Sequence, residues 1–287
     1  MTISAKEFWA AMLCLLVQPA CAFAEGIDTE HIYGFMIGSD VGSLGEREFQ
    51  SEATGRFSKQ NGTYQALGQR VELEFVPIRN FRIEVGTTFS AYDIQFVPGF
   101  VNRSQADWQG ASFDLRYRFF DRDTAPFGLT LALESHGNRF DETTASPARN
   151  YGTELTLALE RDLIPGLAVA TLNLGYQPDW THFAGTPTAE QEATLSAAFG
   201  VMAQLRPGFL LGGEARYFRK YDGIALNGLA GEAFFIGPTA YFQLSERARL
   251  TATWSIQAWG RPAGSSATLD LIDFERQQAR LVFGISF

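Results

Sequence analysis

The chain has 287 residues and is rich in Phe (25) and Gly (28), while charged residues make up only 19% of it. Its net charge of −9 and its pI of about 4.9 argue against nucleic acid as a partner, because that activity needs a basic surface. The mean hydropathy of −0.07 excludes a bundle of transmembrane helices, but it fits a membrane barrel, in which outward apolar and inward polar residues average out.

The first 24 residues have the pattern of a signal peptide. Lys6 precedes the apolar stretch 8–17, which is too short to span a bilayer as a helix. Ala22-Phe-Ala24 then offers an A-x-A cleavage site, so we expect cleavage after Ala24. The mature chain, residues 25–287, is expected to form a single domain.

Cleavage at this point would remove both cysteines of the chain, Cys14 and Cys21. The mature protein would then have no disulfide and no thiolate metal site. Cys21 also raises the alternative of a lipoprotein, but Gln18 stands where a lipobox would have an apolar residue.

From residue 31 on, one pattern recurs: a strand of about ten alternating residues, a tight turn, a second strand and a longer polar loop. This pattern is typical of outer-membrane barrels. The first strand is expected over His31 to Ser39, with Tyr33, Phe35 and Ile37 on one face, and a polar loop over 42–62. The apolar rows of the following strands lie at 71–75, 81–85, 113–119, 127–133, 155–159, 170–176, 195–201, 209–217, 234–244, 250–256 and 274–287.

The pattern predicts an all-β fold, a closed antiparallel transmembrane barrel of twelve strands, with ten or fourteen as alternatives. An even number places both termini on the side of the short turns, which in such barrels is the periplasm. Pro238 lacks an amide donor, so we expect a bulge or a strand end there. Aromatic residues beside the turns and the loops match interfacial girdles, which favours a membrane barrel over a soluble β-sandwich.

The last residues form a period-2 apolar row, Leu281, Phe283, Ile285 and Phe287, which ends on the terminal carboxylate. This tail resembles the C-terminal assembly signal of bacterial outer-membrane β-barrel proteins. The resemblance implies export by the Sec machinery, insertion by the β-barrel assembly machinery, and contact with outer-membrane lipids and lipopolysaccharide. We expect the last strand to pair with the first, with Phe287 beside residues 31–33.

Three further stretches, residues 214–223, 237–239 and 274–280, are similar to a group of uncharacterised proteobacterial envelope proteins. This resemblance brings no known activity and no functional residues.

Many charged side chains of both signs share the inward register of the strands. They could line a wet, porin-like lumen, or they could form an ion-pair network that plugs and stiffens the barrel. Mixed charge indicates no preference for either ion sign. The candidate lumen-lining residues are Arg70, Glu72, Arg82, Glu84, Asp114, Arg116, Arg118, Glu134, Glu154, Glu214, Arg216, Arg249 and Arg280.

His136, with Glu134 on the same strand face, is the one candidate for catalysis. Phospholipases and lipid A deacylases of the outer membrane use a Ser–His pair, with the Ser two residues after the His. That position is Asn138 here, and Ser135 points the other way in a regular strand. We therefore expect no enzyme, no cofactor and no metal site.

Three functions remain open at this point. The first is a small porin-like channel or uptake protein, the second is a lipid hydrolase, and the third is a plugged structural or surface-interaction barrel. Whether the interior is open along its axis would separate the first from the third.

Overall fold

The structure is a computed structural model that describes residues 26–287. The expected signal peptide and its cleavage site at Ala24 lie outside this range. Within it, the chain has no helix of the length and apolarity needed to cross a membrane.

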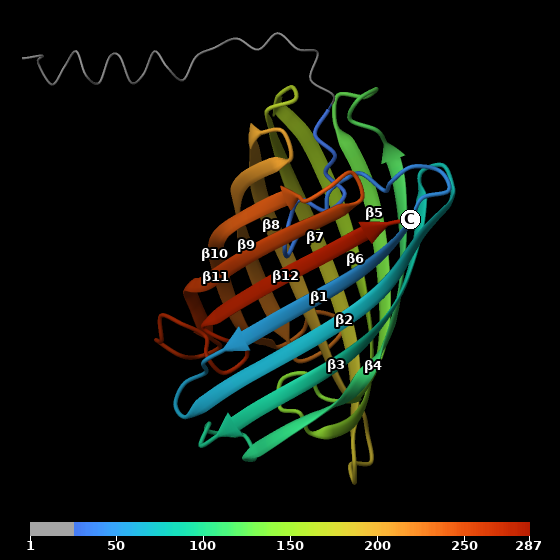
Figure 1. The fold of residues 1–287 in the computed structure, drawn as a ribbon. Coiled ribbons are helices and arrows are strands. Elements are labelled where there is room, and N and C mark those ends of the chain that lie inside the picture. The colour runs from blue at the N-terminus through green and yellow to red at the C-terminus, as the bar shows by residue number, and fades with distance from the viewer. Residues whose placement is uncertain (1–25) are drawn as a thin grey trace, which may run out of the picture.

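Twelve antiparallel strands form a closed barrel in which each strand pairs with its neighbours in the chain and β1 pairs with β12 (Figure 1). The predicted closed twelve-stranded barrel is therefore confirmed. The strands are β1 (Arg47–Phe57), β2 (Thr63–Ile78), β3 (Phe81–Gln95), β4 (Arg103–Phe120), β5 (Gly128–Phe140), β6 (Pro147–Ile164), β7 (Ala168–Phe183), β8 (Glu190–Arg206), β9 (Phe209–Tyr221), β10 (Leu229–Gln243), β11 (Ala248–Pro262) and β12 (Gln277–Ser286).

The period-2 pattern places apolar side chains outside and charged ones inside. In β2, Leu73 is 58% exposed while Glu72 and Glu74 on either side of it are buried. In β3, Val85 is exposed while Glu84 is buried. The outward positions suit contact with lipid and the inward positions suit a polar interior, so the same alternating pattern fits both environments.

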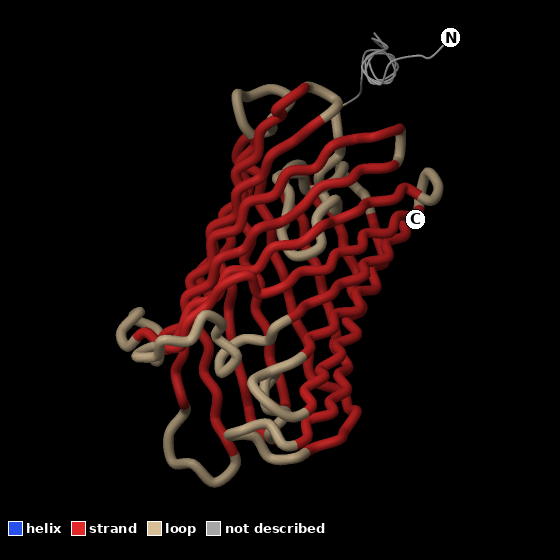
Figure 2. The backbone as a smooth tube through the Cα atoms, turned by 90° about the vertical axis from the view of Figure 1, so that its left-hand side faces the viewer, coloured by secondary structure: helices blue, strands red, loops and turns tan. Residues whose placement is uncertain are grey.

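Short turns lie at one end of the barrel and longer loops at the other, with one exception: the connection 121–127, at the short-turn end, is as long as the loop 96–102 (Figures 1 and 2). The pairing of Glu48 with Ser286 places the start of β1 and the end of β12 at the short-turn end. We continue to expect this end to face the periplasm.

The first strand was predicted in the wrong place. β1 is Arg47–Phe57, inside the stretch expected to be a loop, and residues 31–39 form no strand. The outward positions of β1 include Ser51, Ala53 and Gly55, so the strand has few outward apolar side chains. The apolar row at 31–39 is more pronounced, but it does not face lipid.

Two smaller differences concern β10 and β12. Pro238 lies within β10 and pairs with Gly213 of β9, while the ladder to β11 skips Gly237 and Pro238. A register shift in the same ladder lies between Phe234 and Phe235. The amide of Phe287 donates to the carbonyl of Arg47 at 3.0 Å, so the C-terminus adjoins β1 and not residues 31–33 as expected.

Candidate functional site

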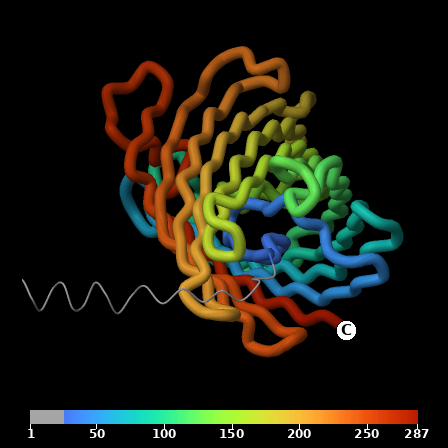
Figure 3. Tube along the Cα trace, turned by 90° about the horizontal axis from the view of Figure 1, so that it is seen from above, coloured from blue at the N-terminus to red at the C-terminus, as the bar shows by residue number. Residues whose placement is uncertain are grey.

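Residues 26–46, called the plug segment here, enter the barrel at its short-turn end. Most of residues 27–41 are buried in the lumen, whereas residues 43–45 are exposed at the rim. Seen along the barrel, the segment is the blue tube inside the ring of strands, and from the side it enters the same end (Figures 2 and 3). Its hydrogen bonds reach strands on all sides of the barrel: β3, β4, β5, β6, β7, β9, β11 and β12. The lumen of this structure is therefore occupied.

Side chains of the barrel wall hold the backbone of the plug segment. The Glu214 carboxylate accepts hydrogen bonds from the amides of Gly34 (2.8 Å) and Phe35 (2.9 Å). The Asn173 side chain accepts from the Ile37 amide at 2.8 Å and donates to the Ile37 carbonyl at 3.0 Å. A buried backbone needs such partners, and here they replace the ladder that a strand would have.

An apolar patch on the inner wall receives the other face of the plug segment. Ile32 and Met36 are buried against inward residues of β7, β8 and β9. Burial of each such side chain contributes about 1.5–3 kcal/mol. The residues of this cluster are Ile27, Ile32, Tyr33, Met36, Val169, Ala198, Met202 and Leu210.

Charged residues near the short turns fix both ends of the plug segment. Glu160 accepts hydrogen bonds from the Thr29 hydroxyl (2.6 Å) and the Ser39 hydroxyl (3.0 Å), and it forms an ion pair with Arg122 at 2.6 Å. Asp40 pairs with Arg118 at 3.2 Å. Glu160 thus joins the beginning and the end of the segment.

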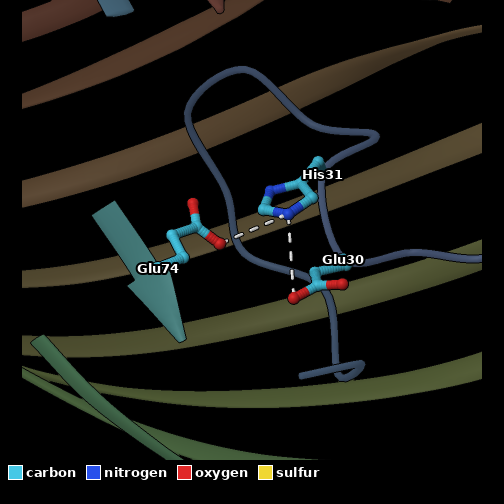
Figure 4. Close-up of side chains that lie close together, drawn as sticks. All are labelled: Glu30, His31 and Glu74. Carbon is cyan, nitrogen blue, oxygen red and sulfur yellow. Dashed lines mark ion pairs between the residues drawn. The ribbon is translucent and has the colours of Figure 1, made fainter. Parts of the chain in front are cut away.

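His31 of the plug segment faces carboxylates of the wall and of its own segment. Its Nε2 lies 3.7 Å from Glu30, 3.5 Å from Glu74 and 3.6 Å from Glu48 (Figure 4 shows the first two). Glu30, His31 and Glu74 are close enough to share a metal ion. However, Arg82 forms ion pairs with Glu30 and Glu74, so a guanidinium already balances their charge.

The titration of this cluster follows from its burial. Burial raises the pKa of Glu30 to about 8, against the opposing effect of Arg82. Burial, assisted by Arg249 and Arg82, lowers the pKa of His31 well below its usual range. His31 is therefore neutral at pH 7 and adds no charge to the cluster.

Six carboxylates form a continuous row around half of the inner wall. Each is the direct register partner of the next, on six consecutive strands from β1 to β6. Like charges placed directly opposite each other are destabilising, so the row needs compensation. We call it the acidic row: Glu48, Glu74, Glu84, Asp114, Glu134 and Glu154.

Arginines beside the acidic row compensate most of it. Arg82 pairs with Glu84 at 2.6 Å and Glu74 at 3.3 Å, and Arg116 pairs with Glu84 at 2.9 Å and Asp114 at 3.0 Å. Arg70 pairs with Glu134 at 3.1 Å. Glu154 has no ion pair within residues 26–287, and its carboxylate accepts only the Thr156 hydroxyl, at 3.0 Å.

A cavity of about 200 Å³ lies between the plug segment and the acidic row. On its plug side, the Phe35 ring lies 3.7 Å from the Arg216 guanidinium and 4.6 Å from that of Arg280. Among the described residues that line it, acidic side chains outnumber arginines by seven to five: Glu30, Glu52, Glu72, Glu84, Asp114, Glu134 and Glu154, against Arg70, Arg116, Arg216, Arg249 and Arg280.

Two of the longer loops narrow the opposite end of the lumen. The loop 141–146 packs on inward residues of β2 and β3, and its carbonyls accept from the hydroxyls of Tyr64 (3.0 Å) and Tyr92 (3.1 Å). In the loop 263–276, Asp270 is fully buried, and burial raises the pKa of its carboxyl to about 6.

The candidate residues from the sequence occupy two places. Ten of them line the cavity: Arg70, Glu72, Glu84, Asp114, Arg116, Glu134, Glu154, Arg216, Arg249 and Arg280. Three contact the plug segment instead: Arg82 through Glu30, Arg118 through Asp40, and Glu214 through the backbone of Gly34 and Phe35. At the end of β12, Val282 is buried while Leu281 and Ile285 are exposed.

His136 does not meet Glu134 or a serine. Its Nε2 lies 3.2 Å from Asp179 and 3.2 Å from the Asn150 amide oxygen, while Glu134 pairs with Arg70. Ser135 contacts Thr153 at 3.3 Å.

Ser112, the register partner of His136 on β4, does not supply a nucleophile either. A Cβ added to Gly152 would meet the His136 ring, and one added to Gly86 would meet the Ser112 hydroxyl. The ring and the hydroxyl therefore lean toward opposite sides, and the geometry is not that of a Ser–His pair.

The residues of the plug segment were not among the predicted site residues. Glu30, His31 and Phe35 were placed in or beside a lipid-facing strand. The Gly residues at 34, 38, 42 and 45 were the available signal, because so many glycines in one short stretch fit an irregular segment better than a membrane strand.

Solved structures share this fold at low sequence identity. The COG4313 outer membrane channel from Pseudomonas putida F1 has 10% identity and a TM-score of 0.61, over 87% of this chain and 98% of that one. The beta domain of the Bordetella autotransporter BrkA has 14% identity and a TM-score of 0.50, over 85% and 100%. The KdgM porin, solved with disordered oligogalacturonate, has 9% identity and a TM-score of 0.46, over 84% and 99%.

The fold is therefore that of bacterial outer-membrane barrels. No curated protein matches the chain. A family model described as a family of unknown function, DUF6662, matches residues 25–287.

Proposed function

The chain belongs to the DUF6662 family of unknown function, and we propose that it is an outer-membrane channel for small cationic solutes that its plug segment closes. The observation that carries this proposal is the way the lumen is filled. Wall side chains alone fill a barrel of about eight strands, and this barrel of twelve strands encloses more space. Here the plug segment fills one end, and hydrogen bonds to Glu214 and Asn173 hold it there. Water can replace these hydrogen bonds when the segment leaves.

The acidic row supports a positive charge on the solute. Four of its carboxylates, those of Glu84, Asp114, Glu134 and Glu154, line the cavity from the consecutive strands β3 to β6. Glu154 is left without an arginine partner in the described part of the chain. A cation passing along this wall would exchange its water for carboxylate oxygens, as in the charged rings of cation channels. An anion would meet the same row as a barrier.

A disulfide lock tests whether the path crosses the plug segment. We expect the mature chain to have no cysteine, so Ser39→Cys with Gly128→Cys introduces one pair. A Cβ on Gly128 would lie 2.8 Å from that of Ser39, and a shift of about 1 Å in the segment brings the pair to disulfide geometry. In planar bilayers, the oxidised protein should show no openings, and reduction should restore them.

The single variants Ser39→Cys and Gly128→Cys serve as controls, because they carry the same side chains without the bond. Equal conductance of the oxidised and reduced double variant would mean that ions bypass the plug segment. Absence of conductance from every form, in several salts, would support the plugged structural barrel instead.

Selectivity is tested by Glu134→Gln with Glu154→Gln. An unpaired carboxylate such as that of Glu154 attracts a cation near the path by about 1 kcal/mol, or about fivefold in occupancy. Removing the charge of Glu134, which pairs with Arg70, makes the path more positive as well. The reversal potential in a KCl gradient should therefore move toward that of a non-selective pore. Glu232→Gln is the matched control, since Glu232 pairs with Tyr217 and Arg261 and does not line the cavity. An unchanged reversal potential in the double variant would remove the acidic row from the permeation path.

A further inference from the structure

Two arginines and a histidine lie side by side on the outer face of the barrel, at the long-loop end. Arg149 of β6 is the register partner of His182 of β7. Arg139 of β5 lies next to Arg149, between the pairs Asn138–Asn150 and Phe140–Pro147. All three side chains are exposed.

These arginines differ from the others at the same end. Arg219 and Arg261, on the opposite side of the barrel, both pair with Glu232, at 3.9 and 3.2 Å. Within residues 26–287, neither Arg139 nor Arg149 has an ion pair, so both present an unneutralised guanidinium at the edge of the lipid-facing surface.

An apolar groove begins beside these arginines. It has a volume of about 830 Å³ and crosses the outer faces of β4, β3, β2, β1 and β12. Small side chains at Ala53, Ala91 and Ala279 leave the space, and Leu67, Phe89 and Trp108 border it. The Arg139 guanidinium lies 5.7 Å from the centre of the Trp108 ring, so the groove and the cations meet at that tryptophan.

We propose that this surface binds one phosphate-bearing acylated lipid of the outer leaflet, lipopolysaccharide, with an acyl chain in the groove and a lipid A phosphate at Arg139 and Arg149. Guanidinium groups bind phosphate through paired, charge-assisted hydrogen bonds. An apolar groove next to them matches the acyl chain that the same molecule carries. The expected orientation, with the longer loops at the cell surface, places the site in the leaflet that contains this lipid.

A second copy of the chain fits this surface less well. In a two-fold dimer the same patch meets itself, so Arg139 and Arg149 would face their own counterparts. Juxtaposed like charges disfavour such a contact. A lipid phosphate supplies the opposite charge.

The test compares binding of purified diphosphoryl lipid A and of fully dephosphorylated lipid A to the full mature protein in detergent, by native mass spectrometry. Arg139→Ser with Arg149→Ser should weaken binding of the diphosphoryl form about tenfold or more. Arg219→Ser with Arg261→Ser, at the same end, should leave it unchanged. Ala91→Trp should weaken binding of both forms, because it fills the groove. Heat-modifiable migration on gels checks that every variant is folded.

Three results would overturn the proposal. The first is equal affinity of wild type and the Arg139/Arg149 variant for diphosphoryl lipid A, and the second is equal affinity of the wild type for both lipid forms. The third is a protein dimer that Ala91→Trp dissociates, which would assign the groove to a second copy. Conductance of the Arg139/Arg149 variant is expected to match wild type, so this site and the channel can fail separately.

Discussion

Replacing Glu214 by alanine should raise the open probability of the channel about a hundredfold. The Glu214 carboxylate holds the amides of Gly34 and Phe35 in the centre of the plug segment. A hydrogen bond to a charged group contributes about 1.5–3 kcal/mol. Loss of both would weaken the closed state by about 3 kcal/mol, which corresponds to a factor of about a hundred.

Single-channel recording measures this directly, and proteolysis of the N-terminal segment in the folded protein gives a second readout. Glu232→Ala is the control, because Glu232 is an acidic residue of the neighbouring strand without a hydrogen bond or ion pair to the plug segment in residues 26–287. If Glu214→Ala leaves both the open probability and the protease sensitivity at wild-type levels, Glu214 does not hold the segment closed.

Arg82→Met should lower the free energy of unfolding by about 3–5 kcal/mol, the largest effect on stability that we expect from a single substitution. Arg82 is only 1% exposed and pairs with Glu30, Glu74 and Glu84. Methionine fills much of the same volume, but it leaves Glu30 and Glu74 buried without their cation, while Glu84 keeps Arg116. Breaking a buried ion pair on one side is costly for this reason.

Urea unfolding in detergent micelles, followed by tryptophan fluorescence, measures the difference. The double variant Arg82→Met with Glu74→Gln should recover part of the loss, since it removes one of the uncompensated charges. Arg79→Met, at an exposed turn position, should change stability by less than about 0.5 kcal/mol. A loss below about 1 kcal/mol in Arg82→Met would mean that the acidic row does not depend on this guanidinium.

Much of the barrel follows from the sequence because lipid outside and polar groups inside impose the same alternation on every strand. Leu73 and Val85 are clear outward positions, and Glu72 and Glu84 are clear inward ones. β1 escaped prediction because it carries Ser51, Ala53 and Gly55 on its outer face. The alternating apolar residues Tyr33, Phe35 and Ile37 led to the prediction of a strand where none exists. An apolar row of this kind can pack inside an occupied lumen as well as against lipid.

The site was less predictable than the wall. The inward register identified Glu214 as a lumen residue, but its partners Gly34 and Phe35 lie about 180 residues earlier in the chain. No local pattern connects them. The acidic row could not be predicted for a related reason. Glu134 and Glu154 are neighbours only in the exact register between β5 and β6. Turn lengths fix this register, and a shift of one residue would separate the two side chains.

The plug segment continues into β1 at Arg47, and its last residues already bond β2: the Gly45 amide donates to the Val76 carbonyl at 2.8 Å and the Val76 amide donates to the Glu46 carbonyl at 3.1 Å. The stretch that leads into this junction contains Gly42 and Gly45 with φ of 78° and 86°. Both are left-handed conformations that glycine adopts without strain. Residues 26–44 belong to no β-ladder, so this part of the segment can leave the lumen without breaking a strand pair. The molecule thus has two cooperative units, the barrel wall and the plug segment, whose stabilities can differ by many kcal/mol. Evolution could therefore tune the lifetime of the closed state through Glu214 or Asn173 while the wall stays as stable as its membrane requires.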